Sequence, residues 1–298
     1  MNNLKFAFFG TSNFSVFCLE ELKTLGFLPT LIITTPDKPA GRKLILTPTP
    51  VKIWAQKNKI ECLTPEKLDS YFTLKLSVLN LPLFLVASYG KIIPKNIVDL
   101  PKNGILNIHP SLLPKYRGPS PLQTQILNGD KEVGVSIIKI DEQVDHGSLV
   151  TQKKIILDNI LNFNDLEKKL AEEGSKLFVK ILPDWITENL ETKDQNHEEA
   201  TFTKKIKKTD GLIDIEKGDP YKNYLKFLAY SAWPQVYFFI KKKHNLTPAL
   251  PLANGREKEK IRVIIKEAEF KDDKFIIKKV LPEGKKEMSY ADFLRGLI

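Results

Sequence analysis

Short apolar runs alternate with amphipathic stretches through residues 1–190, and this alternation limits the possible folds more than any other feature of the sequence. The apolar runs have the length of buried strands, and the stretches between them repeat apolar residues at helical spacing. Strands that alternate with helices are typical of a parallel, doubly wound α/β sheet, which binds ligands at the carboxyl ends of its strands. The expected strands are 4–9, 28–34, 81–87, 104–109 and 133–140, and the expected helices include 15–25, 51–58 and 164–179.

The last third of the chain has a different pattern. Residues 188–199 are polar and acidic, and the lysine-rich residues that follow also lack apolar periodicity, which indicates a linker. Beyond them, short apolar runs separated by turn signals favour a small, OB-like β-barrel. We therefore expect an α/β domain over 1–190, a linker over 191–207 and a C-terminal β-barrel domain over 208–298.

The charge and the cysteine content narrow the class of protein. The formal net charge of +10 and a pI near 9.3 favour binding to a polyanion such as RNA. Cys18 and Cys62 have no partner at the spacing of a metal or redox motif, so we expect no metal. No apolar run approaches the ~20 residues of a membrane helix, and the start lacks the order of a secretory signal. The expected location is the cytoplasm, without membrane attachment.

Three polar residues lie at or after the ends of predicted strands. Asn107 and His109 are two positions apart at the end of strand 104–109, so they share a face, and Asp145 follows strand 133–140 at what we expect to be another carboxyl end. In acyl transfer to an amine, an amide and a protonated imidazole can donate to the oxyanion. A carboxylate can stabilise that imidazolium and accept the amine proton, directly or through water. We therefore expect these residues to be catalytic, although His109 or Asp145 taken singly could also be structural.

The loop after His109 is rich in proline. Prolines at 110, 114, 119 and 121 keep it out of a helix, and we expect its backbone groups to be free to bind a ligand. Neither Ser111 nor a cysteine lies in the elbow motif of a covalent nucleophile. The turn 10–13 lacks the three-glycine spacing of a dinucleotide site. We expect direct transfer through a tetrahedral intermediate, without a covalent enzyme intermediate.

The stretch from Asn107 to Pro114, together with Asp145, resembles the folate-dependent formyltransferases. The resemblance implies a mixed, Rossmann-like, parallel-rich sheet, no metal, and 10-formyltetrahydrofolate as the formyl donor. It assigns catalytic roles to Asn107, His109 and Asp145. It also implies folate contacts through Ser111, Leu112, Leu113 and Pro114, and through Val86, Tyr89 and Gly90 in a loop that borders the pterin.

Other parts of the chain indicate which molecule accepts the formyl group. Residues 37–52 are similar to the inserted loop with which methionyl-tRNA formyltransferases reach the acceptor stem, and cations on such a loop can follow phosphates. The stretch 42–46 departs from the family pattern, which has a glycine and a second lysine there. The interdomain segment and the barrel resemble the same family, so we expect the formyl group to go to methionyl-initiator tRNA and the protein to be a monomer. The expected RNA contacts are Arg42, Lys43, Lys204, Lys205, Lys207 and Lys208.

Alternatives to this interpretation remain. One is a related enzyme that acts on a nucleotide sugar or on glycinamide ribonucleotide, or a hydrolase that releases formate from the same folate. A glycinamide ribonucleotide enzyme would be shorter, and a sugar enzyme would lack the basic loop 39–52. The other is an RNA-binding protein without catalysis, against which the presence of Asn107, His109 and Asp145 together argues. The basic loop itself could also be a solvated surface loop.

Overall fold

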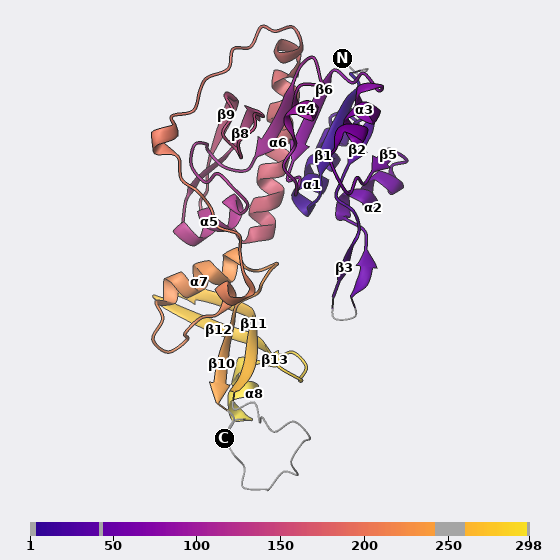
Figure 1. Ribbon diagram of the computed structural model, residues 1–298. Coiled ribbons are helices and arrows are strands. Elements are labelled where there is room, and N and C mark those ends of the chain that lie inside the picture. The colour runs from indigo at the N-terminus through magenta and orange to yellow at the C-terminus, as the bar shows by residue number, and fades with distance from the viewer. Residues whose placement is uncertain (1–3, 42–43, 242–259, 297–298) are drawn as a thin grey trace. The chain divides into compact units, whose positions relative to one another are not determined.

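The computed structural model describes residues 4–41, 44–241 and 260–296, and its largest feature is a seven-stranded sheet (Figure 1). The strands span Phe6–Gly10 (β1), Leu31–Ile33 (β2), Glu61–Leu63 (β5), Leu83–Ala87 (β6), Ile105–His109 (β7), Glu132–Lys139 (β8) and Leu149–Ile156 (β9). Their order is β5-β2-β1-β6-β7-β8-β9, in which β5 to β7 are parallel and β8 and β9 are antiparallel to their neighbours. The five expected strands are present, and the parallel-rich α/β fold class is confirmed.

The direction of β8 differs from that of a parallel sheet, which the alternation of strands and helices predicts, and agrees with the mixed, parallel-rich sheet that the resemblance implies. Residues 110–131 join β7 to β8, and their one α-helix is the eight-residue α5 (Pro121–Asn128). Most of α5 belongs to a compact unit other than the one that holds the sheet. A parallel neighbour requires a crossover connection, usually a helix packed on the sheet. Because the described segment supplies no such helix, β8 pairs with β7 in the antiparallel direction.

The chain divides into two compact units. The first comprises Met1–Leu122, Lys131–Asn159 and Asp165–Lys204 and contains the seven-stranded sheet. The second comprises Gln123–Asp130, Ile160–Asn164 and Lys205–Ile298. Most of the segment expected to be a linker, 191–207, is therefore packed as part of the first unit.

Helices cover both faces of the seven-stranded sheet (Figure 1). On one face lie α1 (Asn13–Thr24) and α6 (Phe163–Ile186), and a Cβ at Gly174 of α6 would lie 2.4 Å from the Ile108 side chain of β7. On the other face lie α3 (Ser70–Ser77) and α4 (Lys95–Val98), whose Phe72 and Ile97 belong to the same buried cluster as Val86. Helix α2 (Pro50–Lys57) packs against α1 and β5. Since side chains alternate along β7, Asn107 and His109 point away from α6.

Two short strands, β3 (Lys38–Ala40) and β4 (Ile45–Thr47), form a hairpin that extends away from the sheet (Figure 1). Leu44, Ile45 and Leu46 are 71%, 62% and 64% exposed. This hairpin lies within the loop that the sequence predicts to contact RNA. Arg42 and Lys43 lie outside the described residues.

The second unit contains an antiparallel sheet of order β10-β11-β12-β13. Its elements are β10 (Tyr237–Lys241), β11 (Lys260–Lys271), β12 (Lys274–Pro282), β13 (Met288–Ser289), α7 (Pro220–Ala229) and α8 (Tyr290–Arg295). Asp272 and Asp273 join β11 to β12 with φ of 51° and 56°, as a tight two-residue hairpin requires. Phe270 and Phe275 beside this turn contact aromatic side chains of α7. The small C-terminal β-domain expected from the sequence is thus observed.

Two 3₁₀ turns lie between the main elements, η1 (His197–Glu199) and η2 (Lys208–Gly211). Among the described residues, no helix combines the length and apolar character needed to cross a membrane.

Candidate active site

Two polar side chains lie at the carboxyl end of β7, on the sheet face opposite α6. Val86 of β6 is the register partner of Asn107, and Ser136 of β8 is the register partner of His109. His109 is 4% exposed, and Asn107 is half-buried. A buried histidine at this end of a parallel strand lies where such sheets bind ligands.

Asp145 reaches the same place from the loop between β8 and β9. One carboxylate oxygen, Oδ1, lies 3.4 Å from Nδ1 of His109 and accepts a hydrogen bond of 3.4 Å from Nδ2 of Asn107. The other, Oδ2, accepts a shorter hydrogen bond of 2.8 Å from the backbone N–H of Gly118. The two 3.4 Å contacts are longer than ordinary hydrogen bonds, so the Gly118 N–H is the firmest direct contact of this carboxylate among those described. The structure brings together the three residues that the sequence predicts to be catalytic.

The charge of the Asp145 carboxylate is set by its neighbours. Its side chain is 13% exposed, and burial alone would raise the pKa of the carboxyl group. The facing His109 ring and the Gly118 N–H outweigh burial, with a further contribution from the Arg117 guanidinium. The pKa of Asp145 is therefore held below its usual value of 3.8. The group is a carboxylate at neutral pH, as a stabiliser of an adjacent imidazolium must be.

Both ring nitrogens of His109 face oxygen atoms. Nδ1 faces Asp145, and Nε2 lies 3.1 Å from the backbone carbonyl oxygen of Tyr116. A neutral imidazole has one N–H and can donate to one of these oxygens, whereas the imidazolium can donate to both. To donate to an oxyanion, Nε2 would have to share or leave its contact with Tyr116.

The position of Asp145 depends on a tightly folded loop, because β8 runs antiparallel to β7. Asp145 follows the carboxyl end of β8, as predicted, but this end lies beside the start of β7, where Lys139 pairs with Leu106. The loop 141–148 returns along the sheet, and Asp145 takes a positive φ of 51°. A Cβ at Gly147 would lie 1.8 Å from the carbonyl oxygen of Lys139. Only glycine allows this close approach, which brings Asp145 back to His109.

Residues 111–114, expected to contact folate, adjoin His109 and are held by two side chains of the neighbouring strands. The Ser136 hydroxyl donates to the backbone oxygen of Ser111 and accepts from the backbone N–H of Leu113. The Gln152 amide donates to the carbonyl oxygen of Leu113. The sequence predicts that the backbone groups of this loop are free, but those of Ser111 and Leu113 are used within the protein. The segment is therefore a fixed wall beside His109.

The second set of expected folate contacts lies at the end of β6. Val86 is buried next to Asn107, and Gly90 is exposed. Tyr89 packs its ring edge-on against Phe9, 5.3 Å between centroids, and its hydroxyl is buried with no hydrogen-bond partner among the described residues. Burial raises the pKa of this hydroxyl to about 12. Tyr89 thus contributes to the core, and Val86 and Gly90 lie beside the candidate site.

Four of the predicted RNA contacts, the lysines at 204, 205, 207 and 208, lie where the chain passes from the first compact unit to the second. Lys204 ends the first compact unit, and Lys205, Lys207 and Lys208 begin the second. All four side chains are exposed. They lie on or next to η2, where the Lys207 N–H donates to Asp210 over 2.6 Å.

Two buried residues next to Asp145 were given no role in the sequence analysis. Arg117 is 3% exposed and Gln195 is 4% exposed, and the guanidinium donates to the Gln195 side-chain oxygen. Arg117 lies in the proline-rich loop, and a charged residue next to Gly118 in that loop could have indicated a functional role. Gln195 lies in a polar segment without periodicity, so nothing in its local sequence marks it as buried.

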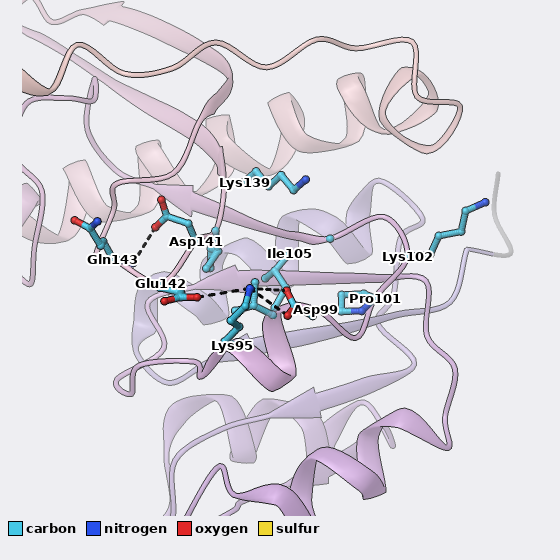
Figure 2. Close-up of a pocket in the computed structure, with 12 residues that line it drawn as sticks. Lys95, Asp99, Pro101, Lys102, Ile105, Lys139, Asp141, Glu142 and Gln143 are labelled. Atoms are coloured by element: carbon cyan, nitrogen blue, oxygen red, sulfur yellow. Dashed lines mark hydrogen bonds and ion pairs between the residues drawn. The ribbon is translucent and has the colours of Figure 1, made fainter.

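A surface cavity of about 510 Å³ has residues Asp141–Gln143 in its lining (Figure 2). Lysine and carboxylate side chains line it, and Lys95 forms ion pairs with Asp99 and Glu142. None of the three predicted catalytic residues lines this cavity. Within the described part of the chain, no group of three or more His, Cys, Asp or Glu side chains could hold a metal ion.

Known proteins are similar to this chain in sequence and in fold. The formyl transferase family matches residues 4–182. The chain is 38% identical over 239 residues to a methionyl-tRNA formyltransferase of Thermotoga maritima, covering 80% of this chain and 76% of the relative. It is 34% identical over 302 residues to that of Halalkalibacterium halodurans, covering 98% and 95%. The solved structure of the methionyl-tRNA formyltransferase from Clostridium thermocellum has a TM-score of 0.58 at 18% identity, covering 94% of this chain and 98% of that chain. The chain belongs to the formyl transferase family and, within it, to the methionyl-tRNA formyltransferases.

Proposed function

We propose that this protein transfers the formyl group of 10-formyltetrahydrofolate to the free amino group of methionyl-initiator tRNA, giving N-formylmethionyl-tRNA. The observation that carries the proposal is the cluster of Asn107, His109 and Asp145, with its carboxylate held in the charged form, in a chain of this family. The folate is a substrate, and the wall formed by 111–114 beside His109 is where it would bind.

The transfer needs these residues as donors and as a proton acceptor. The neutral amine of the acceptor forms a bond to the formyl carbon, and the carbonyl oxygen becomes an oxyanion to which the Asn107 amide and the His109 imidazolium donate. The Asp145 carboxylate takes the amine proton, directly or through water. As the bond to the folate nitrogen breaks, a proton passes to that nitrogen, which leaves tetrahydrofolate. No covalent enzyme intermediate is required.

Residues other than the catalytic three are proposed to hold the RNA. The β3–β4 hairpin, together with Arg42 and Lys43, would contact the acceptor stem, and the exposed lysines at 204, 205, 207 and 208 would attract the RNA backbone. We place the protein in the cytoplasm as a monomer, and size-exclusion chromatography tests the second statement.

One assay separates the proposal from its alternatives. The protein is mixed with 10-formyltetrahydrofolate, with and without methionyl-tRNA, and both free formate and formylated aminoacyl-tRNA are measured. The proposal expects formylated tRNA and little free formate. Formate released without RNA would indicate a hydrolase, and a lack of both products with retained tRNA binding would indicate an RNA-binding protein without catalysis.

The acceptor assignment has its own test in the hairpin. Replacing Arg42 and Lys43 together by alanine should raise the apparent KM for methionyl-tRNA, lower the turnover of that substrate and leave folate binding nearly unchanged. Arg42→Ala should have the larger single effect, because a planar guanidinium can hold a phosphate or a base edge with two hydrogen bonds. Unchanged tRNA kinetics in the double variant would contradict a role of the hairpin.

A further inference from the structure

Residues 193–204, which we call the strap, run alongside the loops that form the candidate active site. Lys193 exchanges two backbone hydrogen bonds with Leu149, of 2.7 and 2.8 Å. Further along, the Thr201 carbonyl accepts from the Arg117 N–H over 2.9 Å, and the Thr203 N–H donates to the Arg117 carbonyl over 2.8 Å. The strap is therefore joined by backbone hydrogen bonds to both the start of β9 and the proline-rich loop.

The side chain of Gln195 points from the strap to the backbone of the loop that carries Asp145. Its Nε2 donates to the carbonyl oxygen of Asp145 over 3.0 Å and to that of Gly147 over 2.7 Å. An amide nitrogen has two N–H groups, and both are used here. The two acceptors lie on either side of His146, so one buried side chain fixes the turn in which Asp145 sits.

Arg117 determines which way the Gln195 amide faces. The Gln195 Oε1 accepts from Nε of Arg117 over 3.1 Å and from Nη2 over 2.6 Å. A guanidinium has no acceptor, so the amide must present its oxygen to Arg117 and its nitrogen to the two carbonyls. Nη2 of Arg117 also lies 2.9 Å from Nδ1 of His197, whose ring stacks on that of His146 at 4.1 Å between centroids. Only one orientation of the Gln195 amide therefore satisfies these donors and acceptors.

The Asp145 backbone needs such external support. Its φ of 51° lies in the left-handed region, which an aspartate keeps in a folded protein only where the surrounding structure fixes it. Its contacts with His109 and Asn107, at 3.4 Å, are too long to hold the carboxylate in place alone. The Gly118 N–H holds the other oxygen, Oδ2, over 2.8 Å, so the approach of Oδ1 to His109 depends on the backbone of the loop as well.

We propose that Gln195 is a positioning residue of the active site, which holds the Asp145 carboxylate against His109 through the Asp145 and Gly147 carbonyls while Arg117 fixes the orientation of its amide. The proposal rests on the proposed formyl transfer through Asp145. It makes Gln195 a part of the catalytic site, although the polar sequence of its segment is typical of a linker.

Two substitutions at Gln195 test the role. Gln195→Leu removes the two donors and the acceptor of Arg117, whereas Gln195→Glu keeps an acceptor for Arg117 and removes the donors to the two carbonyls. We expect each to lower kcat for formylation of methionyl-tRNA by about 10-fold to 100-fold, because a small displacement of a catalytic group costs rates of this order. The KM values for both substrates should change less than about 3-fold, since the loop backbone and not a substrate contact is altered. If Gln195→Leu fails to fold, Gln195→Glu still gives the answer, because it leaves the buried guanidinium paired.

Asn196→Ala is the matched control. Asn196 is the next residue of the strap, is exposed, and its side chain contacts Glu198 and Glu199 rather than the catalytic loop. We expect its kcat to stay within about 2-fold of the parent value, as is usual for a surface substitution. An equal loss of kcat in this control would mean that any change in the strap is harmful and would overturn the specific role of Gln195.

A double-variant cycle with Asp145→Asn distinguishes positioning from general stability. If Gln195 acts through the Asp145 carboxylate, Gln195→Glu should cost less than about 3-fold in an Asp145→Asn background, since coupled residues are not additive. Multiplied losses in the double variant, or a parental kcat in both folded Gln195 variants, would overturn the proposal. The parent protein is assayed alongside, and its failure to formylate methionyl-tRNA would instead refute the proposed function.

Discussion

Among the described residues, two largely buried carboxylates have different surroundings: Asp145 lies in the candidate active site, and Glu167 lies where α6 faces Phe14 and Cys18 of α1. Both are largely buried, with 13% exposure for the Asp145 side chain and 5% for Glu167. At Asp145 an imidazole, a backbone N–H and a guanidinium outweigh burial and lower the pKa. At Glu167 burial outweighs the backbone N–H of Phe14 and raises the pKa to about 7. Burial therefore does not decide the charge of a carboxylate; its partners do.

The difference separates a carboxylate that can take part in catalysis from one that packs. The Asp145 carboxylate remains charged at neutral pH beside a histidine and a half-buried amide. Glu167 is about half protonated near pH 7 and lies among apolar side chains of α6. This distinction between the two carboxylates would be wrong if substitution of Glu167 lowered turnover, or if substitutions around Asp145 left turnover unchanged.

The largest expected effect lies at the donors beside Asp145. Asn107→Ala and His109→Ala should each lower turnover by a factor on the order of 100 or more, because each removes a donor to the oxyanion and leaves substrate binding largely intact. Steady-state kinetics with methionyl-tRNA, together with equilibrium binding of the folate, checks this. A variant that keeps near-parental turnover would remove its residue from the mechanism.

A comparable loss is expected for Asp145→Asn, which keeps the shape of the side chain but not its charge. The amide cannot hold a proton or stabilise the His109 cation, so the proton steps should slow and the pH–rate profile should change. In the parent enzyme the depressed pKa keeps Asp145 ionised above about pH 4. Any acid limb between pH 5 and 8 should therefore come from another group. Parental rates and an unchanged profile would show that Asp145 is structural.

Much of this site was predictable from the sequence, because the relevant signals are local. Asn107 and His109 share a face through the two-residue period of a strand, and that period is readable without a structure. Gln195 was not predictable, because its partners Asp145 and Arg117 lie 50 and 78 positions away along the chain. Nothing in a polar segment without periodicity indicates that one glutamine is buried.

The fold, too, was predictable from the sequence only where the signals are local. The five strands expected from apolar runs are present, since each run is short, buried and bounded by turn residues. The alternation of strands and helices does not show that β8 is the antiparallel neighbour of β7, because direction depends on whether the connecting helix packs on the sheet, and the sequence of α5 does not reveal that. Strand β9 was missed because its side chains are mostly exposed or half-buried, so it has no apolar run.

A smaller effect, on stability alone, is expected for Glu167→Gln. The carboxyl group has a pKa of about 7 in the folded protein against a usual 4.5. The stability that this raised pKa contributes is present in full below pH 4.5 and is lost as the pH rises through 7. The loss is at most about 3.5 kcal/mol, at roughly 1.4 kcal/mol for each of the 2.5 pH units between the two values. Glutamine does not titrate, so the variant should gain Tm over the parent between pH 5 and 8 and keep its turnover. A Tm difference that does not vary with pH would contradict a buried, titrating Glu167.

The smallest effect per residue is expected for the exposed lysines 204, 205, 207 and 208. Unlike the groups around Asp145, they have no fixed geometry to lose, so alanine should weaken tRNA binding and leave turnover at saturating tRNA nearly unchanged. Each lost phosphate contact should flatten the log–log salt dependence of binding by roughly one unit, taking duplex DNA as a guide. Binding measured at several salt concentrations checks this, with Lys217→Ala, an exposed lysine outside the cluster, as the control. A fall in turnover at saturation would indicate that these lysines also act on the catalytic site.

The most direct test of the catalytic assignment is formylation of methionyl-tRNA by 10-formyltetrahydrofolate, compared between the parent protein, Asp145→Asn and Glu167→Gln at neutral pH. The two substitutions each replace a buried carboxyl group by an amide of nearly the same shape. We expect formylated tRNA at parental rates from Glu167→Gln and a loss on the order of 100-fold in Asp145→Asn, with folate binding retained in all three. Equal rates in the two variants, or no formylated tRNA from the parent protein, would contradict the assignment.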